Sequence, residues 1–355
     1  MPDTIPKSAL APSRFHVVIP CYNCERYIDI CLDSLRNQAF TQWTALVADD
    51  ASQDRTARLA SRHAADDPRI TVHSGFQRAW LMGNTLATLR SLHLAPSDVV
   101  AVLDGDDFIR PDCLQRLWDA HQQGYDIVYT DETIERQKHS IGGPLLRGVP
   151  VREQAWCFSQ LRSFKAYLFG LLDDATFRDE SGRYFRAAGD LSLYLPMAEL
   201  AGPDKVHFIP ERLYFYRVHD QCNSAVMRHE QLCNNRYIRS RPALARQTTH
   251  FDFRLRLNGH QQPPASQHTP DLWSQLSELI QNEVLHQHST IELPVTLEKS
   301  DLPRLGPAVR ALLPQPYTIA VEHIILPEER DAWRAYHGLW IGEGVFLMGV
   351  PASTM

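Results

Sequence analysis

The sequence predicts an α/β protein built on a doubly wound sheet. Short apolar and β-branched runs alternate with amphipathic segments through the first half of the chain, which is the pattern of successive strand and helix units. One run, residues 99–103, is apolar throughout, as expected for a strand buried on both faces. Of the 355 residues, 44% are hydrophobic and the net charge is −6, so we expect a packed core rather than disorder.

The expected elements follow in chain order. A strand at residues 15–19 precedes a helix whose apolar positions recur every three or four residues, namely Ile28, Cys31, Leu32 and Leu35. Further strands are expected at 43–48, 70–73, 99–103 and 126–130, alternating with helices at 55–65, at 79–92 and from 111. Beyond them the pattern predicts helices at 159–172 and 190–200 and strands at 206–209 and 213–218.

Acidic and amide side chains follow the ends of several strands. Asn23 and Asp50 come after the first and second strands, and Asp104, Asp106 and Asp107 come after the apolar strand. Ligands of open α/β sheets bind beyond the carboxyl ends of the strands, so these side chains are expected to line one crevice. Neighbouring carboxylates repel each other unless a cation compensates, and Mg²⁺ and Mn²⁺ prefer hard oxygen ligands. The alternative is an acidic turn that caps the helix starting at residue 111.

Several motifs, in this order and spacing, resemble the family 2 glycosyltransferases with the GT-A fold. The segments are VVIPCYN at 17–23, VADDAS at 47–52, LDGDD at 103–107, FRAAGDLSLY at 185–194 and YRVH at 216–219. The resemblance implies a Rossmann-like nucleotide-diphospho-sugar transferase domain, and the residues that it does not cover are expected to form a small C-terminal α+β extension. It also implies an inverting, metal-dependent transfer of a sugar from a nucleotide-diphosphate sugar, with a UDP-sugar expected, to an acceptor hydroxyl in glycan or cell-surface polysaccharide synthesis.

The resemblance further implies roles for individual residues. The nucleotide-sugar site would consist of Pro20, Tyr22, Asn23, Asp50, Arg78, Asp104 and Gly105. Within it, Asp50 would accept a hydrogen bond from the nucleotide base. The ligands of a Mn²⁺ or Mg²⁺ ion that bridges the diphosphate would be Asp104, Asp106 and His219. Asp190 would be the general base that takes the proton of the acceptor hydroxyl.

Alternatives stay open for some of these assignments. Gly189 stands where the family usually has Glu, and Asp190 falls at an expected helix start, where it could be an N-cap. His219 could be a structural histidine. At the level of function, a catalytically idle nucleotide-sugar binder is one alternative. A phosphatase of the haloacid dehalogenase type is another, since an apolar strand ending in Asp-x-Asp also suits an aspartyl nucleophile with Mg²⁺.

The expected organisation has four parts. They are an N-terminal tail at 1–13, a catalytic domain at 14–228, a connecting segment at 229–270 and a C-terminal module of unknown function at 271–355, which opens with an amphipathic helix over 271–288. No signal peptide or membrane span is predicted, so we expect a cytoplasmic protein with at most peripheral membrane association. A pI near 6.2 argues against nucleic-acid binding. The expected partners are the sugar donor and a glycan or other hydroxyl acceptor, and the sequence indicates no oligomeric state.

Overall fold

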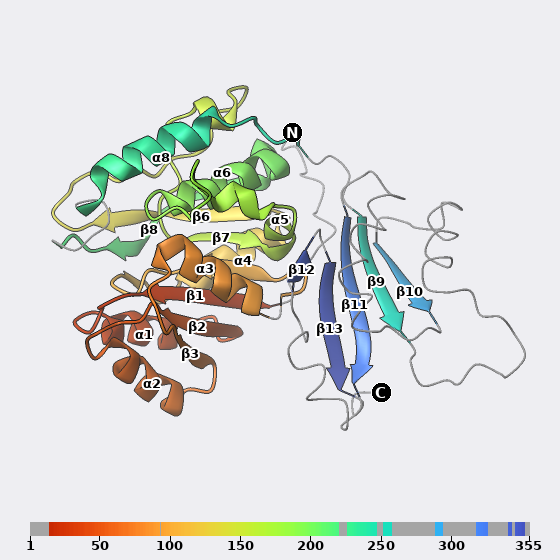
Figure 1. Cartoon of the computed structure of the whole chain (residues 1–355), viewed down its shortest axis with the longest axis horizontal. Coiled ribbons are helices and arrows are strands. Elements are labelled where there is room, and N and C mark those ends of the chain that lie inside the picture. The colour runs from red at the N-terminus through yellow and green to blue at the C-terminus, as the bar shows by residue number, and fades with distance from the viewer. Residues whose placement is uncertain are drawn as a thin grey trace, which may run out of the picture. The chain divides into compact units, whose positions relative to one another are not determined.

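The computed structural model describes residues 14–92, 94–219 and 226–246, together with five strand segments between residues 251 and 351 (Figure 1). The chain divides into two compact units. The first comprises residues 1–89, 97–168 and 173–246, and the second comprises residues 90–96, 169–172 and 247–355. All of the predicted site residues belong to the first unit.

An eight-stranded mixed sheet forms the centre of the first unit. Its strands are β1 (Phe15–Cys21), β2 (Trp43–Asp49), β3 (Ile70–Ser74), β4 (Val99–Val102), β5 (Phe108–Ile109), β6 (Ile127–Ile134), β7 (Arg162–Lys165) and β8 (Val206–Tyr216). They lie in the order β3-β2-β1-β4-β7-β6-β8-β5. The first four of these are mutually parallel, whereas β7 is antiparallel to both β4 and β6. The predicted α/β class is therefore confirmed, with β8 as one strand in place of the two expected between residues 206 and 218.

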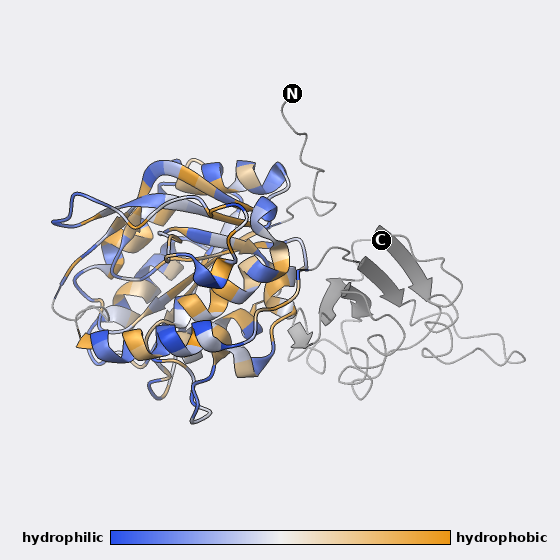
Figure 2. Cartoon of the chain, turned by 90° about the horizontal axis from the view of Figure 1, so that it is seen from above, coloured by the Kyte–Doolittle hydropathy of each residue, from blue (hydrophilic) through white to orange (hydrophobic). Residues whose placement is uncertain are grey.

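Helices pack around this sheet (Figure 1). They are α1 (Ile28–Arg36), α2 (Thr56–Asp66), α3 (Trp80–Ser91), α4 (Cys113–Gln122), α5 (Ala166–Gly170), α6 (Gly189–Ala201) and α8 (Arg228–Ser240). Hydrophilic and hydrophobic residues alternate along many of these helices (Figure 2), as expected when one face is buried. None of the helices in the described part of the chain is both long and apolar enough to span a membrane.

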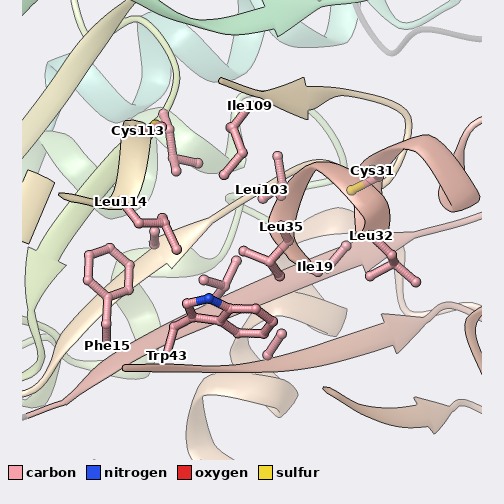
Figure 3. Packing of buried hydrophobic residues seen from close by; sticks show 14 of the residues in the cluster. Phe15, Ile19, Cys31, Leu32, Leu35, Trp43, Leu103, Ile109, Cys113 and Leu114 are labelled. Carbon is pink, nitrogen blue, oxygen red and sulfur yellow. The ribbon is translucent and has the colours of Figure 1, made fainter. Parts of the chain in front are cut away.

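An apolar core lies between α1, α4 and the sheet. The predicted inner face of α1 is confirmed, since its four apolar positions are fully buried: Ile28, Cys31, Leu32 and Leu35. Figure 3 shows Leu32 and Leu35 beside the strands that carry Ile19 and Trp43. Burying one such leucine contributes about 1.5–3 kcal/mol to folding. This packing fixes the edge of the sheet from which the loop after β1 emerges.

The structure differs from the sequence prediction over residues 159–172. In place of one helix, this segment forms β7 followed by the short helix α5. Every residue of β7 is buried, including Arg162 and Lys165, which form ion pairs with Asp190 and Asp126. The prediction was wrong because this central strand contains polar residues. In the sequence they resemble the exposed face of a helix, because the ion-pair partners that allow them to be buried lie far away in the chain.

The described residues of the second unit between 251 and 351 form a five-stranded sheet. Its strands are β9 (Phe251–Leu257), β10 (His288–Leu293), β11 (Tyr317–Ile325), β12 (Trp340–Gly342) and β13 (Val345–Pro351), in the order β10-β9-β11-β13-β12. Only β12 pairs in the antiparallel sense among these strands. Helix α8, apart from its first residue, and strand β9 fall within the expected connecting segment. The helix expected at 271–288 lies, except for its last residue, outside the described residues.

The packing of α1 leads to a stability prediction. Leu32→Ala is expected to lower the free energy of unfolding by about 2–5 kcal/mol, because it removes buried methyl groups and leaves a cavity against the sheet. Ile30→Ala on the same helix is the matched control, since the Ile30 side chain is 47% exposed, and its effect should stay below about 1 kcal/mol. Urea denaturation followed by circular dichroism measures both, and equal losses would contradict the assigned inner face.

A buried histidine leads to a prediction about pH. His121 Nδ1 lies 3.0 Å from the carbonyl oxygen of Tyr125, and its Nε2 lies 2.9 Å from Ser163 Oγ. Burial, assisted by the charge of Lys165, lowers the pKa of His121 to about 3. The unfolded chain takes up this proton near pH 6.5 and the folded chain does not, so the free energy of unfolding should fall as the pH drops from about 6.5 toward 3.

The measurement compares urea denaturation of the wild type and His121→Gln at pH 7 and pH 4.5. The acid-induced loss of stability should be smaller in the variant by about 2 kcal/mol, because the buried group no longer titrates. The same loss in both proteins would show that His121 does not remain neutral in the folded state.

Candidate functional site

A pocket of about 500 Å³ opens at the carboxyl ends of β1, β2 and β4. Its lining includes nine of the ten predicted site residues, namely Pro20, Tyr22, Asn23, Asp50, Arg78, Asp104, Asp106, Asp190 and His219. Gly105 lies between two lining residues, and its backbone N–H donates to the carbonyl oxygen of Pro20 at 3.1 Å. The fold therefore brings residues from widely separated parts of the chain to one place.

Asn23 joins the loop after β1 to the loop after β2. Its backbone has a φ of 53°, in the left-handed region that asparagine tolerates better than most residues. Its N–H donates to Ser52 Oγ at 2.9 Å, and its Oδ1 accepts the backbone N–H of Gln53 at 2.9 Å. Asn23 thus holds two pocket loops together.

Asp50 anchors the loop that leads into α3. Its two carboxylate oxygens accept the backbone N–H groups of Ala79 and Trp80 at 2.6 and 2.9 Å. Burial raises the pKa of Asp50, while these two hydrogen bonds act in the opposite direction. The carboxylate is therefore a fixed acceptor in the pocket wall, and it orders the loop that carries Arg78.

Arginines stack on aromatic rings beside Asp50. The guanidinium of Arg78 lies 3.7 Å from the ring centroid of Tyr22 and 3.9 Å from that of Trp80. The guanidinium of Arg186 lies 3.8 Å from the Trp80 ring. Trp80 and Arg186 were not among the predicted site residues: Trp80 belongs to none of the motifs, and Arg186 lies in the motif at 185–194 without an assigned role. Together these contacts place flat rings and positive charge along one wall of the pocket.

Asp107 ties the acidic turn to β8. Its carboxylate accepts the hydroxyl of Tyr214 at 2.6 Å and the backbone N–H of Arg217 at 2.7 Å. Burial, together with the charges of Asp106 and Asp104, raises its pKa. Both of its oxygens are engaged within the protein, so Asp107 holds the segment after β8 against the acidic turn.

Asp106 and His219 form a pair inside the pocket. His219 Nε2 lies 2.9 Å from Asp106 Oδ2, and the imidazole stacks on the ring of Tyr27 at a centroid distance of 5.1 Å. Asp104 lies close by, and burial together with the charge of Asp106 raises the pKa of Asp104 to about 7. Helix α4 begins only at Cys113 and has no side-chain N-cap, so the acidic turn does not cap it.

The carboxylate oxygens and the imidazole nitrogen of these residues would hold a divalent cation whose coordination the substrate would complete. Within the described residues, no three Asp, Glu, His or Cys side chains converge as a ready-made metal site, and this includes Asp104, Asp106 and His219. The pair of Asp106 and His219 offers an oxygen and a nitrogen 2.9 Å apart. Mg²⁺ commonly binds through one or two protein groups plus substrate phosphates, so Asp106 and His219 would hold the cation together with the substrate.

Asp190 lies in the first turn of α6, with its side chain 35% exposed. The N-cap of this helix is Ala188, so Asp190 does not have the capping role considered as its alternative. Its Oδ1 accepts the backbone N–H of Leu191 at 2.8 Å, and its Oδ2 accepts Arg162 Nη1 at 2.6 Å. The carboxylate is therefore held from two directions while one side faces the pocket.

Sequence reasoning missed the residues that connect Asp190 with Asp104. Gln160 Oε1 accepts Arg162 Nε at 3.2 Å, and Gln160 Nε2 donates to Asp104 Oδ2 at 3.1 Å. The backbone N–H of Gln160 donates to the buried Glu132 at 2.9 Å. These residues belong to none of the motifs. A correct prediction of β7 would have placed Arg162 in the sheet interior, where a charged residue needs a partner.

The sequence predicts an α/β sheet with a carboxylate-lined crevice at the strand ends, and the structure has both. Residues 16–177 match the family model described as "Glycosyl transferase family 2". The matched residues make up just under half of the chain, and this part is similar to glycosyl transferase family 2. This match favours a transferase over the phosphatase alternative.

Two relatives match part of the chain. A "Chondroitin synthase" of Escherichia coli is 29% identical over 195 residues, which cover 53% of this chain and 27% of that protein. An "Uncharacterized glycosyltransferase EpsJ" of Bacillus subtilis is 30% identical over 113 residues, which cover 32% of this chain and 32% of that protein. The chain thus spans less than half the length of either relative.

Solved structures with a similar arrangement include S. aureus TarS 1–349 in complex with UDP-GlcNAc. It has 18% sequence identity, a TM-score of 0.48 and coverage of 60% of this chain and 61% of that one. The mannosyltransferase PcManGT from Pyrobaculum calidifontis, in complex with GDP-Man and Mn²⁺, has 19% identity, a TM-score of 0.47 and 68% coverage of each chain.

The close packing at Gly105 leads to a further prediction. In Gly105→Ala the added Cβ would lie 2.6 Å from Cys21 Cβ and 3.3 Å from the carbonyl oxygen of Pro20. Backbone at the end of β1 must then move, and stability should fall by about 1–3 kcal/mol. Gly143→Ala is the control, because its Cβ would meet no atom within 4 Å. Urea denaturation should separate the two variants, and unchanged stability in Gly105→Ala would contradict the packing described.

Proposed function

We propose that this protein is an inverting, metal-dependent glycosyltransferase that moves a sugar from a nucleotide-diphosphate sugar, with a UDP-sugar expected, to an acceptor hydroxyl. The proposal rests on one observation, which is that groups of three kinds line a single pocket of about 500 Å³. They are the anchored carboxylate of Asp50, the acidic pair Asp104 and Asp106 with His219, and the partly exposed carboxylate of Asp190. That volume suits a ligand the size of a nucleotide sugar. The similarity to a chondroitin synthase supports glycan or polysaccharide synthesis as the setting.

The donor nucleotide would bind where the ends of β1 and β2 meet. Asp50 offers its carboxylate to an N–H of the base, and the ring of Tyr22 offers a surface on which the base can stack. Pro20 and Asn23 shape the adjoining loop, and Arg78 stands beside both Asp50 and Tyr22. Asp104 and Gly105 follow at the end of β4, within reach of the ribose and the diphosphate.

Breaking the bond between the anomeric carbon and the diphosphate builds negative charge on the leaving group. Asp106 and His219, with Asp104 beside them, would hold the divalent cation. When bound, Mn²⁺ or Mg²⁺ supplies a positive charge that stabilises the departing diphosphate. Burial, together with the charge of the neighbouring Asp106, raises the pKa of Asp104 to about 7. A cation is stabilising beside carboxylates in this setting.

Asp190 would act as the general base. The acceptor oxygen attacks the anomeric carbon from the face opposite the diphosphate, so the new carbon–oxygen bond forms as the old one breaks and the configuration inverts. The proton of the acceptor hydroxyl passes to the pocket-facing carboxylate of Asp190. The proposal also includes a cytoplasmic location and peripheral association with a membrane, because the protein must act where its sugar donor and its acceptor are both present.

The test combines donor binding with turnover. A thermal-shift screen of UDP- and GDP-sugars with and without Mn²⁺ should find a donor that raises the melting temperature in a metal-dependent way, because a ligand that binds only the folded state stabilises it. Release of nucleoside diphosphate in the presence of a panel of glycan acceptors measures turnover. Asp190→Asn should keep the donor-induced shift and lose turnover by about 100-fold or more.

Asp119→Asn, on the exposed face of α4 and outside the pocket, is the matched control and should behave like the wild type. Donor binding without sugar transfer to any acceptor would favour the idle binder. No response to any nucleotide sugar, with or without metal, would reject the proposed function. Undiminished turnover in Asp190→Asn would remove that residue as the base.

A further inference from the structure

We propose that Arg162 is a positioning residue for the base Asp190, and that Gln160 connects this pair to the donor-binding carboxylate Asp104. The inference rests on the proposed function and adds to it a support from the sheet that no sequence motif indicates. Arg162 does not need to touch either substrate. Its role is to fix where the carboxylate of Asp190 stands when the acceptor hydroxyl arrives.

The geometry supports this role directly. The Arg162 side chain is only 7% exposed, and its Nη1 donates to Asp190 Oδ2 at 2.6 Å. The other oxygen of Asp190 accepts the backbone N–H of Leu191. A carboxylate has about four acceptor sites, so two bonds stop its rotation and still leave sites for a proton from the pocket.

The guanidinium suits this position because it bonds in two directions at once. Nη1 donates to Asp190 while Nε donates to Gln160 Oε1, and the amide of Gln160 continues to Asp104. The guanidinium carbon also lies 5.2 Å from the ring centroid of Tyr194. A lysine keeps the charge but lacks the planar fork, so it can make one of these bonds without fixing the other.

The charges around Arg162 also support a positioning role for this residue. Arg162 interacts electrostatically with Asp190 and Asp104, and also with the buried Glu132. A neutral residue in its place would leave these carboxylates facing one another across the end of β7. The Asp190 side chain is 35% exposed, whereas Glu132 is only 4% exposed, so Asp190 has more freedom to turn away.

The helix cannot provide the same support from the residue before the base. A Cβ at Gly189 would lie 3.2 Å from both Cβ and the sulfur of Met82 on α3. This contact is tight, so a larger side chain at this position, including a glutamate, would press on α3. Support for Asp190 therefore comes from β7, on the other side of the carboxylate.

The experiment compares Arg162→Gln with Arg152→Gln in the full-length protein. Arg152 forms a buried ion pair with Glu199 on the same helix, α6, but lies outside the pocket lining. Both variants lose a buried pair and should lose thermal stability. Only Arg162→Gln should lower kcat, by about 100-fold, because misplacing a catalytic group by about 1 Å has an effect of that size. The KM for the donor should change less than about threefold, since donor contacts are kept.

Two further variants separate positioning from a structural role. Arg162→Lys should recover about tenfold of the lost kcat, because the charge returns without the fork. Arg162→Gln added to Asp190→Asn should cause no further loss, since residues that act through one another are not additive. Where Arg162→Gln yields no folded protein, Arg162→Lys alone tests the proposal, by a kcat about tenfold below wild type at an unchanged donor KM.

Several results would overturn the inference. They are an unchanged kcat in Arg162→Gln, a loss confined to the KM of the donor, a loss that adds fully to that of Asp190→Asn, or an equal loss of kcat in Arg152→Gln. An active wild type with any of these results leaves the proposed function standing. A wild type that transfers no sugar from any nucleotide sugar would reject both.

Discussion

The structure of the site depends on how the protein accommodates several carboxylates at one edge of a sheet. Burial raises the pKa of Asp50, Asp104 and Asp107, which shows that ionised oxygens are disfavoured there without compensation. Each carboxylate receives a different partner: backbone N–H groups for Asp50, Gln160 for Asp104, Tyr214 for Asp107 and Arg162 for Asp190. The loops around the pocket are arranged by these partners, and much of their conformation follows from this requirement.

The strand topology decides which partners are available. Because β7 inserts between β4 and β6 in the antiparallel direction, it carries Arg162 to the end of β4, beside Asp104. Strand β8 pairs with β5, and the chain that follows it brings His219 to Asp106. A wholly parallel sheet would present strand ends only. The antiparallel strand β7 adds the positively charged guanidinium of Arg162, and the segment just before it adds the amide of Gln160.

The sequence predicted the elements whose signal is local. The inner face of α1 follows from the spacing of Ile28 and Leu32, and the motif residues Asp50 and Asp104 lie in the pocket because strand ends converge. It missed β7 and the connection through Gln160, because a buried charge is stable only with a distant partner, and periodicity contains no information about that partner. Trp80 was missed for the same reason, since its place depends on Asp50 binding its backbone N–H.

The crowding of carboxylates in the pocket also links the stability of the fold to ligand binding. With a pKa raised to about 7, Asp104 favours the folded state most when it is protonated, and this contribution is lost as the pH rises from about 4 through 7. At neutral pH the pocket therefore contains repulsion that a bound cation would relieve. Replacing Asp104 or Asp106 with a neutral residue should relieve this repulsion, but in the proposed function it would also remove a carboxylate that holds the cation. The crowding of carboxylates is thus a stability cost that the proposed function would explain.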